Sequence, residues 1–184
     1  NIQENIDAVL QRIAKACNKA QRQPQEVTLL AVTKTVPPEL IKIAVAAGHR
    51  HFGENYVSEG VEKIANLQSE TKAFGLVWHC IGPVQSNKTR LVAEHFDWVH
   101  SIDRLKIAQR LNDQRPIHAK PLQVCIQVNI DGGANKSGVE PSEVLTLAQE
   151  IQKLPHLQLR GIMIIPDPTT DLIAAEVINT RARD

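Results

Sequence analysis

The sequence lacks the long apolar runs and the charge blocks that mark several large classes of protein. No stretch approaches the ~20 apolar residues that span a bilayer, and no charged-then-apolar leader opens the chain, so neither a membrane segment nor a targeting segment is predicted. The 21 basic residues are spread along the chain against 20 acidic ones, for a net charge of +1. Without a basic block, we expect no nucleic acid as a partner.

Cysteine is also scarce, and its three copies, Cys17, Cys80 and Cys125, lie far apart. Their odd number and wide spacing do not fit a disulfide framework or a metal site. Cys80 and Cys125 stand in apolar strand-like runs, where a thiol serves as a small hydrophobic group. A reducing cytoplasm is therefore the expected location, and no metal is predicted. Because the chain begins at Asn1 instead of Met, we also expect its start to be trimmed.

What the sequence does contain is an alternation of helix-like and strand-like segments. Apolar residues at helical spacing predict an amphipathic helix over 2–20. The run 27–34 has no polar alternation, as expected of a strand covered on both faces in a parallel sheet. Pro37 and Pro38 then open a helix that ends at Gly48. Further strands are predicted at 51–55, 77–82, 98–102, 122–130 and 159–165, and further helices at 56–68, 86–96, 104–113 and 141–153.

This alternation predicts a parallel sheet with helical crossovers, and two architectures fit it. One is an open, doubly wound sheet, and the other is a closed (β/α)8 barrel. No Gly-x-Gly-x-x-Gly follows the first strand, which removes the usual reason to favour a dinucleotide-binding sheet. The predicted strands, however, are two fewer than the eight that close a barrel. From the residues alone, both architectures stay open.

Polar and sulfur-containing side chains follow the ends of several predicted strands, where either architecture places its ligand. These residues are Lys34, Asn55, His79 and Met163. A lysine desolvated at such a place would have a lowered pKa and could form a Schiff base, so an aldehyde or an anion is the ligand class indicated.

Each of these residues also has a structural interpretation. Lys34 could simply reach solvent, because a lysine stem can lie along apolar surface while its ammonium stays in water. Asn55 could cap the next helix, and His79 could be a hydrogen-bonded core histidine. Met163 could fill core space, and Lys136, in the loop 131–138, would be solvated.

The order and wording of five motifs are more specific than the residue types. The motifs are AVTKT at 31–35, HFGENYVSEG at 51–60, WHCIGPVQSNK at 78–88, VNIDGGANKSG at 128–138 and LRGIMIIP at 159–166. Together they closely resemble the pyridoxal phosphate homeostasis protein family, whose bacterial members are often called YggS and whose animal member is called PROSC.

The resemblance implies one (β/α)8 TIM-barrel domain over 1–184, similar to the N-terminal domain of alanine racemase. It implies that pyridoxal 5′-phosphate (PLP) is held as a Schiff base on Lys34 and that Asn55, His79 and Met163 line the cofactor. Lys136 would lie at the mouth of the site. Many bacterial relatives carry a second lysine two positions after the first, where this chain has Val36.

The resemblance runs out at about Pro168. Relatives continue with a seventh strand ending in Ser-x-Gly-Met-Ser and an eighth ending in Arg-x-Gly, and these motifs cradle the phosphate. Neither motif is present here. We therefore expect the seventh and eighth strands to be missing and the segment after about 168 to be incomplete, with internal segments of a longer chain omitted.

The expected function is PLP storage and delivery in vitamin B6 homeostasis, without an established catalytic reaction. A racemase needs acid and base groups on both faces of the substrate carbon, and the chain has one tyrosine, Tyr56. We expect a cytoplasmic monomer that passes PLP to PLP-requiring apo-enzymes. Two alternatives stay open: a PLP-dependent amino-acid racemase or transaminase-like enzyme of the same fold, and a barrel without cofactor that serves as an interaction module.

Overall fold

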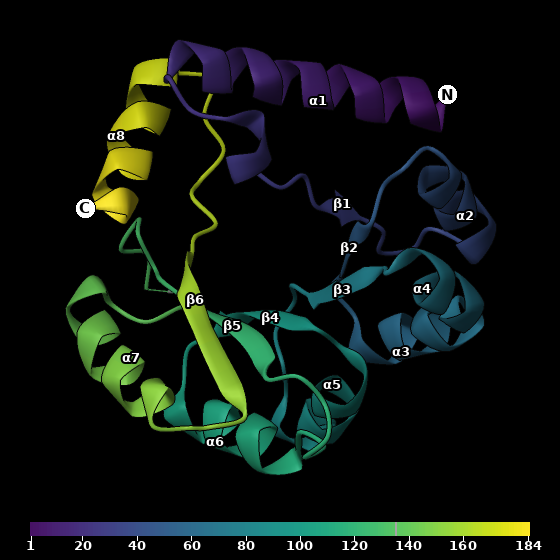
Figure 1. The fold of residues 1–184 in the computed structure, drawn as a ribbon. Helices are drawn as coiled ribbons and strands as arrows, with labels where there is room; N and C mark the ends of the chain where they lie inside the picture. The colour runs from purple at the N-terminus through teal and green to yellow at the C-terminus, as the bar shows by residue number, and fades with distance from the viewer. Residues whose placement is uncertain (135) are drawn as a thin grey trace. The chain divides into compact units, whose positions relative to one another are not determined.

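The computed structural model describes residues 1–134 and 136–184, in which helices and strands alternate (Figure 1). The strands are β1 (Ala31–Val32), β2 (His51–Glu54), β3 (Val77–Cys80), β4 (Trp98–Ile102), β5 (Leu122–Gln127) and β6 (Leu157–Met163). The α-helices are α1 (Ile2–Lys19), α2 (Pro38–Ala46), α3 (Val57–Asn66), α4 (Gln68–Phe74), α5 (Thr89–His95), α6 (Leu105–Gln114), α7 (Val144–Gln152) and α8 (Leu172–Arg183). Short 3-10 helices are η1 (Pro24–Glu26), η2 (Ser86–Lys88) and η3 (Pro141–Glu143).

The chain divides into two compact units, Asn1–His79 and Cys80–Asp184. In the first unit, β1, β2 and β3 are neighbours in that order, and β1 pairs with β2 in parallel, with Val32 opposite Gly53. The core of this unit includes Phe52 and Trp78, which are almost fully buried and whose ring centroids lie 5.5 Å apart. Large aromatic side chains of this kind contribute much of the apolar area that folding removes from water.

The first predicted strand is shorter and less buried in the structure than the sequence indicated. Only Ala31–Val32 of the run 27–34 is strand, Val27 is 38% exposed and Val32 is 50% exposed. The prediction of a strand covered on both faces was wrong at this position. Among the described strands β1 has a hydrogen-bonded neighbour on one side only, β2, so it is an edge strand without the cover of a central one.

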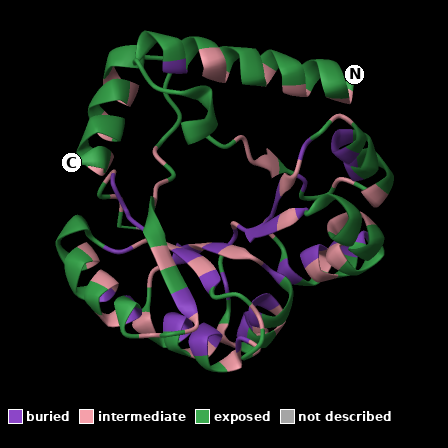
Figure 2. Cartoon of the chain, in the orientation of Figure 1, coloured by how far each residue is buried: buried purple, intermediate pink, exposed green. Residues whose placement is uncertain are grey.

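The second unit is built around β5, which pairs in parallel with β4 and with β6. Leu122, Val124 and Ile126 of β5 are buried, and the register places Gln127 opposite Met163 at the end of the ladder. Figure 2 shows buried residues concentrated in the strands and on one side of α5 and α6, whereas α1 in the first unit is exposed along most of its length. The helices thus cover the strands with one apolar face, as expected for crossover helices of a parallel sheet.

Most of the predicted elements are present. The helix predicted over 56–68 corresponds to α3, and α4, which follows it after Leu67, was not predicted. The predicted segment 141–153 begins as η3 and continues as α7. No helix was predicted after the sixth strand, where α8 begins at Leu172 with Asp171 before it. The Asp171 carboxylate accepts hydrogen bonds from the backbone N–H groups of Ile173 and Ala174, which is an N-cap.

Strand order decides between the two architectures. In each unit every strand lies beside the one before it in the sequence, β1-β2-β3 and β4-β5-β6. A doubly wound sheet reverses its strand order at a switch point, whereas a (β/α)8 barrel adds strands in sequence order. The fold is therefore of the TIM-barrel type, with six parallel strands in the described residues instead of the eight that close a barrel. Within residues 1–134 and 136–184, no helix has the length and apolar character needed to cross a membrane.

Candidate functional site

Lys34 lies two residues beyond the end of β1, in a turn, and is exposed. The β1–β2 register pairs Val32 with Gly53, and Asn55 directly follows β2. In the part of the chain that the structure describes, the Lys34 ammonium forms no hydrogen bond or ion pair. The sequence therefore placed Lys34 at the correct strand end, and its amine is accessible and unengaged in the first unit.

A buried charged cluster lies next to Lys34 in the sequence and in the structure. We call it the Lys63 cluster, and its members are Thr33, Glu54, Glu59 and Lys63. Lys63, on α3, is 5% exposed, and its Nζ lies 2.9 Å from Glu54 Oε1 and 2.7 Å from Glu59 Oε1. Lys63 Nζ also donates to the Thr33 carbonyl oxygen at 2.5 Å, and Thr33 Oγ1 donates to Glu54 Oε2. All three ammonium donors are used, which offsets the cost of burying the charge.

Sequence reasoning missed Lys63. The signal available was the spacing of Glu59 and Lys63, four residues apart on a predicted helix, which favours an ion pair on one helix face. Such a pair is usually solvated, and nothing in the spacing shows burial. The buried partner Glu54 comes from a strand, so only the packing of α3 against the end of β2 reveals the cluster.

Asn55 follows β2 and is half-buried, and its side-chain oxygen Oδ1 is buried without a hydrogen-bond partner among the described residues. The capping interpretation does not hold, because the N-cap of α3 is Tyr56 and no side chain caps that helix. A buried carbonyl oxygen without a donor costs free energy. Asn55 Oδ1 is therefore a buried acceptor without a donor in the described part of the chain.

His79 ends the first unit at β3 and is buried. Its Nε2 lies 3.0 Å from Nδ1 of His51, so one of the two ring nitrogens donates to the other. The neighbouring His49 is also buried and contacts the His51 carbonyl oxygen through Nε2 at 2.7 Å. Burial lowers the pKa of His49 below its usual 6.5, which favours the neutral ring at pH 7.

Three of the four predicted site residues thus follow successive strands of the first unit. Met163 belongs to the second unit, where it ends β6 half-buried, and its carbonyl oxygen accepts from the Val128 N–H at 2.9 Å. Lys34 and Asn55 thus lie just beyond the ends of two neighbouring strands of the first unit, β1 and β2, and Met163 ends β6 in the second unit.

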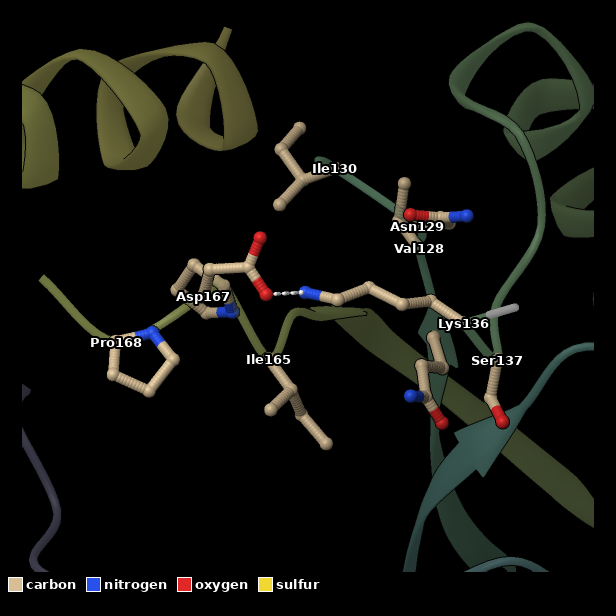
Figure 3. Close-up of a pocket in the computed structure, with 10 residues that line it drawn as sticks. Val128, Asn129, Ile130, Lys136, Ser137, Ile165, Asp167 and Pro168 are labelled. Carbon is tan, nitrogen blue, oxygen red and sulfur yellow. Dashed lines mark ion pairs between the residues drawn. The ribbon is translucent and has the colours of Figure 1, made fainter. Parts of the chain in front are cut away.

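The second unit contains a pocket of about 310 Å³ beyond the ends of β5 and β6 (Figure 3). Its lining residues are Gln127, Val128, Asn129, Ile130, Lys136, Ser137, Ile165, Pro166, Asp167 and Pro168. Figure 3 shows Lys136 and Asp167 pointing toward one another across the pocket. Lys136 Nζ lies 2.5 Å from Asp167 Oδ1 and 2.5 Å from Asp131 Oδ2, so it joins the loop after β5 to the segment after β6.

Lys136 is more constrained than its position in a loop indicated. Its side chain is 34% exposed and is shared by two carboxylates. The hydrogen bonds with Asp131 and Asp167 raise the pKa of Lys136, and the hydrogen bond from Lys136 lowers the pKa of Asp131. Asp167 follows the sixth strand, more than thirty residues away, so no local pattern could have paired it with Lys136. Asn135, which precedes Lys136, lies outside the described residues.

No group of three His, Cys, Asp or Glu side chains in residues 1–134 and 136–184 is arranged to hold a metal ion. The donors at the strand ends are instead an amine, an amide and an imidazole. Such donors suit an organic ligand that carries an aldehyde and hydrogen-bonding groups.

Comparison with known families assigns the fold. The sequence matches the family described as alanine racemase, N-terminal domain, over residues 5–171. The pyridoxal phosphate homeostasis protein of Haemophilus influenzae is 54% identical over 176 residues, which are 96% of this chain and 73% of that protein. The protein of the same name from Escherichia coli is 53% identical over 173 residues, covering 94% of this chain and 74% of the relative.

Solved structures agree with this assignment. PipY of Synechococcus elongatus, solved with PLP bound, superposes with a TM-score of 0.81 at 33% identity, covering all of this chain and 79% of that one. The alanine racemase of Corynebacterium glutamicum gives a TM-score of 0.66 at 17% identity over 98% of this chain and 48% of the racemase. At that identity the racemase shows a shared fold and nothing about activity.

Proposed function

This chain belongs to the family of pyridoxal phosphate homeostasis proteins, and on that premise we propose that it binds pyridoxal 5′-phosphate through Lys34 and serves in vitamin B6 homeostasis. The observation that carries the proposal is the unengaged amine of Lys34 just beyond the end of β1. Asn55, just beyond the end of the neighbouring β2, has a buried Oδ1 without a hydrogen-bond partner among the described residues. PLP is also present in the solved structure of PipY, a relative with 33% identity.

The residues of the first unit fit this cofactor. When bound, PLP supplies an aldehyde carbon that a primary amine can attack. Lys34 would contribute that primary amine and would hold the cofactor through its aldehyde. Asn55 contributes an acceptor that lacks a donor among the described residues, and His79 contributes a buried imidazole that His51 orients. Met163, on β6, is proposed to provide an apolar contact for the cofactor.

We propose a carrier that stores and releases PLP rather than an enzyme. The names of the curated relatives point to homeostasis. Racemisation and transamination also need a proton donor and acceptor at the substrate carbon. The chain's one tyrosine, Tyr56, begins α3 and is 57% exposed, where it is open to solvent.

The remaining expectations from the sequence stay predictions. PLP-requiring apo-enzymes are the proposed recipients, and a monomer in one domain is the proposed form. A cytoplasmic location is proposed because all three cysteines are free thiols, as a reducing compartment keeps them.

Borohydride reduction of the PLP-loaded protein, followed by mass measurement and peptide mapping, tests the attachment. Reduction converts the C=N bond into a stable amine, so we expect one pyridoxyl-phosphate group per chain, on Lys34. Lys42 on α2 is the matched control, because it is an exposed lysine of the same unit. The Lys34→Met chain should carry no adduct, and the Lys42→Met chain should label like the wild type. Labelling spread over surface lysines would contradict the proposal.

A panel of amino acids separates the carrier from the enzyme. We expect no racemisation or transamination of any member of the panel by the PLP-loaded wild type. Substantial turnover that disappears in the Lys34→Met chain would overturn the carrier proposal and identify an enzyme of the same fold.

A further inference from the structure

The backbone on each side of Lys34 is tied to the Lys63 cluster. Before Lys34, the Thr33 carbonyl oxygen accepts from Lys63 Nζ at 2.5 Å, and the Thr33 N–H donates to the Gly53 carbonyl oxygen at 2.9 Å. After Lys34, the Thr35 N–H donates to Glu59 Oε1 at 2.6 Å. The residue that presents the amine is thus held at both of its peptide bonds, while its side chain is not held.

Thr35 itself has a backbone conformation that requires such support. Its φ is +61°, in the left-handed region that β-branched residues rarely adopt. Strained residues of this kind persist where the surrounding structure over-determines them, and they concentrate at functional sites. The Thr35 N–H bond to Glu59 and the turn closed by the Val36 N–H on the Thr33 carbonyl oxygen, at 3.0 Å, supply that support here.

Glu59 is the member of the Lys63 cluster that connects the buried Lys63 ammonium to the turn at Thr35. Its Oε1 accepts from Lys63 and from the Thr35 N–H, so one carboxylate oxygen joins the buried ammonium to the strained turn. The hydrogen bond from Lys63 lowers the pKa of Glu59, which keeps this carboxylate ionised at pH 7. Glu54, on β2, forms an ion pair with Lys63. The turn at Thr35 is therefore connected through Glu59 and Lys63 to the sheet as well as to α3.

We propose that Glu59 and Lys63 are positioning residues that fix the backbone around Lys34 and thereby set the rate at which its amine attaches to an aldehyde. This inference rests on the proposed function of Lys34. An amine carried on a backbone fixed on both sides spends more of its time in the reactive direction, and small misplacements of a reacting group slow a reaction strongly.

The test compares Glu59→Ala with Glu62→Ala on the same helix. Glu62 is exposed and has no hydrogen bond or ion pair with the described part of the chain, so it controls for the loss of a negative charge from α3. Samples mixed with PLP are reduced with borohydride at timed intervals, and the adduct on Lys34 is quantified. Amide hydrogen exchange at Thr35, without PLP, reports separately on whether the tether is intact.

We expect Glu59→Ala to slow labelling of Lys34 by about tenfold or more, since a ~1 Å misplacement can cost ~10²-fold. Exchange at Thr35 should be faster in the same variant, while Glu62→Ala matches the wild type in both measurements. Glu59→Gln keeps an oxygen that can accept from the Thr35 N–H, so it should restore most of the rate. Glu59→Asp keeps the charge, but its side chain is one methylene shorter and should not reach the Thr35 N–H. If Glu59→Ala does not fold, Glu59→Asp is the variant expected to label slowly.

Two results would overturn the inference, and they are distinguishable. Labelling at the wild-type rate in a variant whose Thr35 tether is lost would refute positioning while leaving the proposed function intact. A wild-type chain that takes no label on Lys34 would refute the proposed function first, before any variant is compared, and the inference with it.

Discussion

Lys63 shows at the scale of one residue how a charge can be held inside this fold. Its ammonium meets two carboxylates and a backbone carbonyl oxygen, so each of its donors has a partner. Glu54 is 1% exposed, and its carboxylate accepts hydrogen bonds from Lys63 and from the Thr33 hydroxyl. A buried pair of this kind is weak evidence for net stability, but removing one member leaves the other charge buried and unpaired.

We therefore predict that Lys63→Met lowers the free energy of unfolding by about 3–5 kcal/mol. Lys42→Met is the control, because the ion pair of Lys42 with Glu70 is longer, at 3.5 Å, and Lys42 is 54% exposed. An exposed pair contributes about 0–1 kcal/mol. Urea denaturation of both variants measures the difference, and equal losses would show that the Lys63 cluster contributes no more than a surface pair.

At the scale of elements, the loop after β5 returns to lie directly against the strand end. The Val139 N–H donates to the Gln127 carbonyl oxygen at 2.9 Å, and the Asn129 N–H donates to the Val139 carbonyl oxygen at 2.9 Å. Gly138 precedes this contact with a φ of +109°. A Cβ on Gly138 would lie 2.7 Å from the Asn129 backbone nitrogen, too close for any side chain.

Gly138→Ala should therefore be more destabilising than the same change at Gly75. Gly75 follows α4 with a φ of +69°, and a Cβ there meets nothing within 4 Å. Gly75→Ala should therefore cost only the backbone strain, about 1–3 kcal/mol. At Gly138 the steric clash adds roughly 1–3 kcal/mol to that strain. Thermal unfolding of the two variants measures the difference, and a smaller loss at Gly138 would contradict the close approach of this loop to β5.

At the scale of the whole molecule, each unit contains one tryptophan, Trp78 in the first and Trp98 in the second. Trp98→Phe leaves Trp78 as the reporter of the first unit, and Trp78→Phe leaves Trp98 as the reporter of the second. Because the sequence predicts a single domain, we expect both units to unfold in one cooperative transition.

The measurement is urea denaturation of each variant, followed by tryptophan fluorescence and by far-ultraviolet circular dichroism. Circular dichroism follows the helices of both units, so it provides an internal reference even where the substitution itself changes stability. Coincident curves within each variant would support one domain. A fluorescence transition displaced from the circular dichroism transition would show that the two units unfold separately.

Local sequence patterns were sufficient to place most of the elements. Apolar periodicity and turn residues correctly predicted α1, α2 and the strands at 51–54, 77–80, 98–102 and 122–127. They erred at 27–34, because whether a strand is covered on both faces depends on its neighbours in the sheet and not on its own residues. The pattern of helices and strands left the barrel and the doubly wound sheet undecided, because strand order is a property of the packed chain; the resemblance of the motifs implied the barrel, and the strand order confirms that type of fold.

The sequence by itself determined the family, through five ordered motifs, and the strand-end positions of Lys34, Asn55, His79 and Met163. These depend on residue identity and on position along the chain, both of which can be read directly. Only the tertiary structure showed that Asn55 Oδ1 lacks a hydrogen-bond partner among the described residues, that Lys136 is held by Asp131 and Asp167, and that the Lys63 cluster ties the backbone around Lys34. The physical reason is that burial and ion pairing join residues from separate elements, and no local pattern in the chain records those contacts.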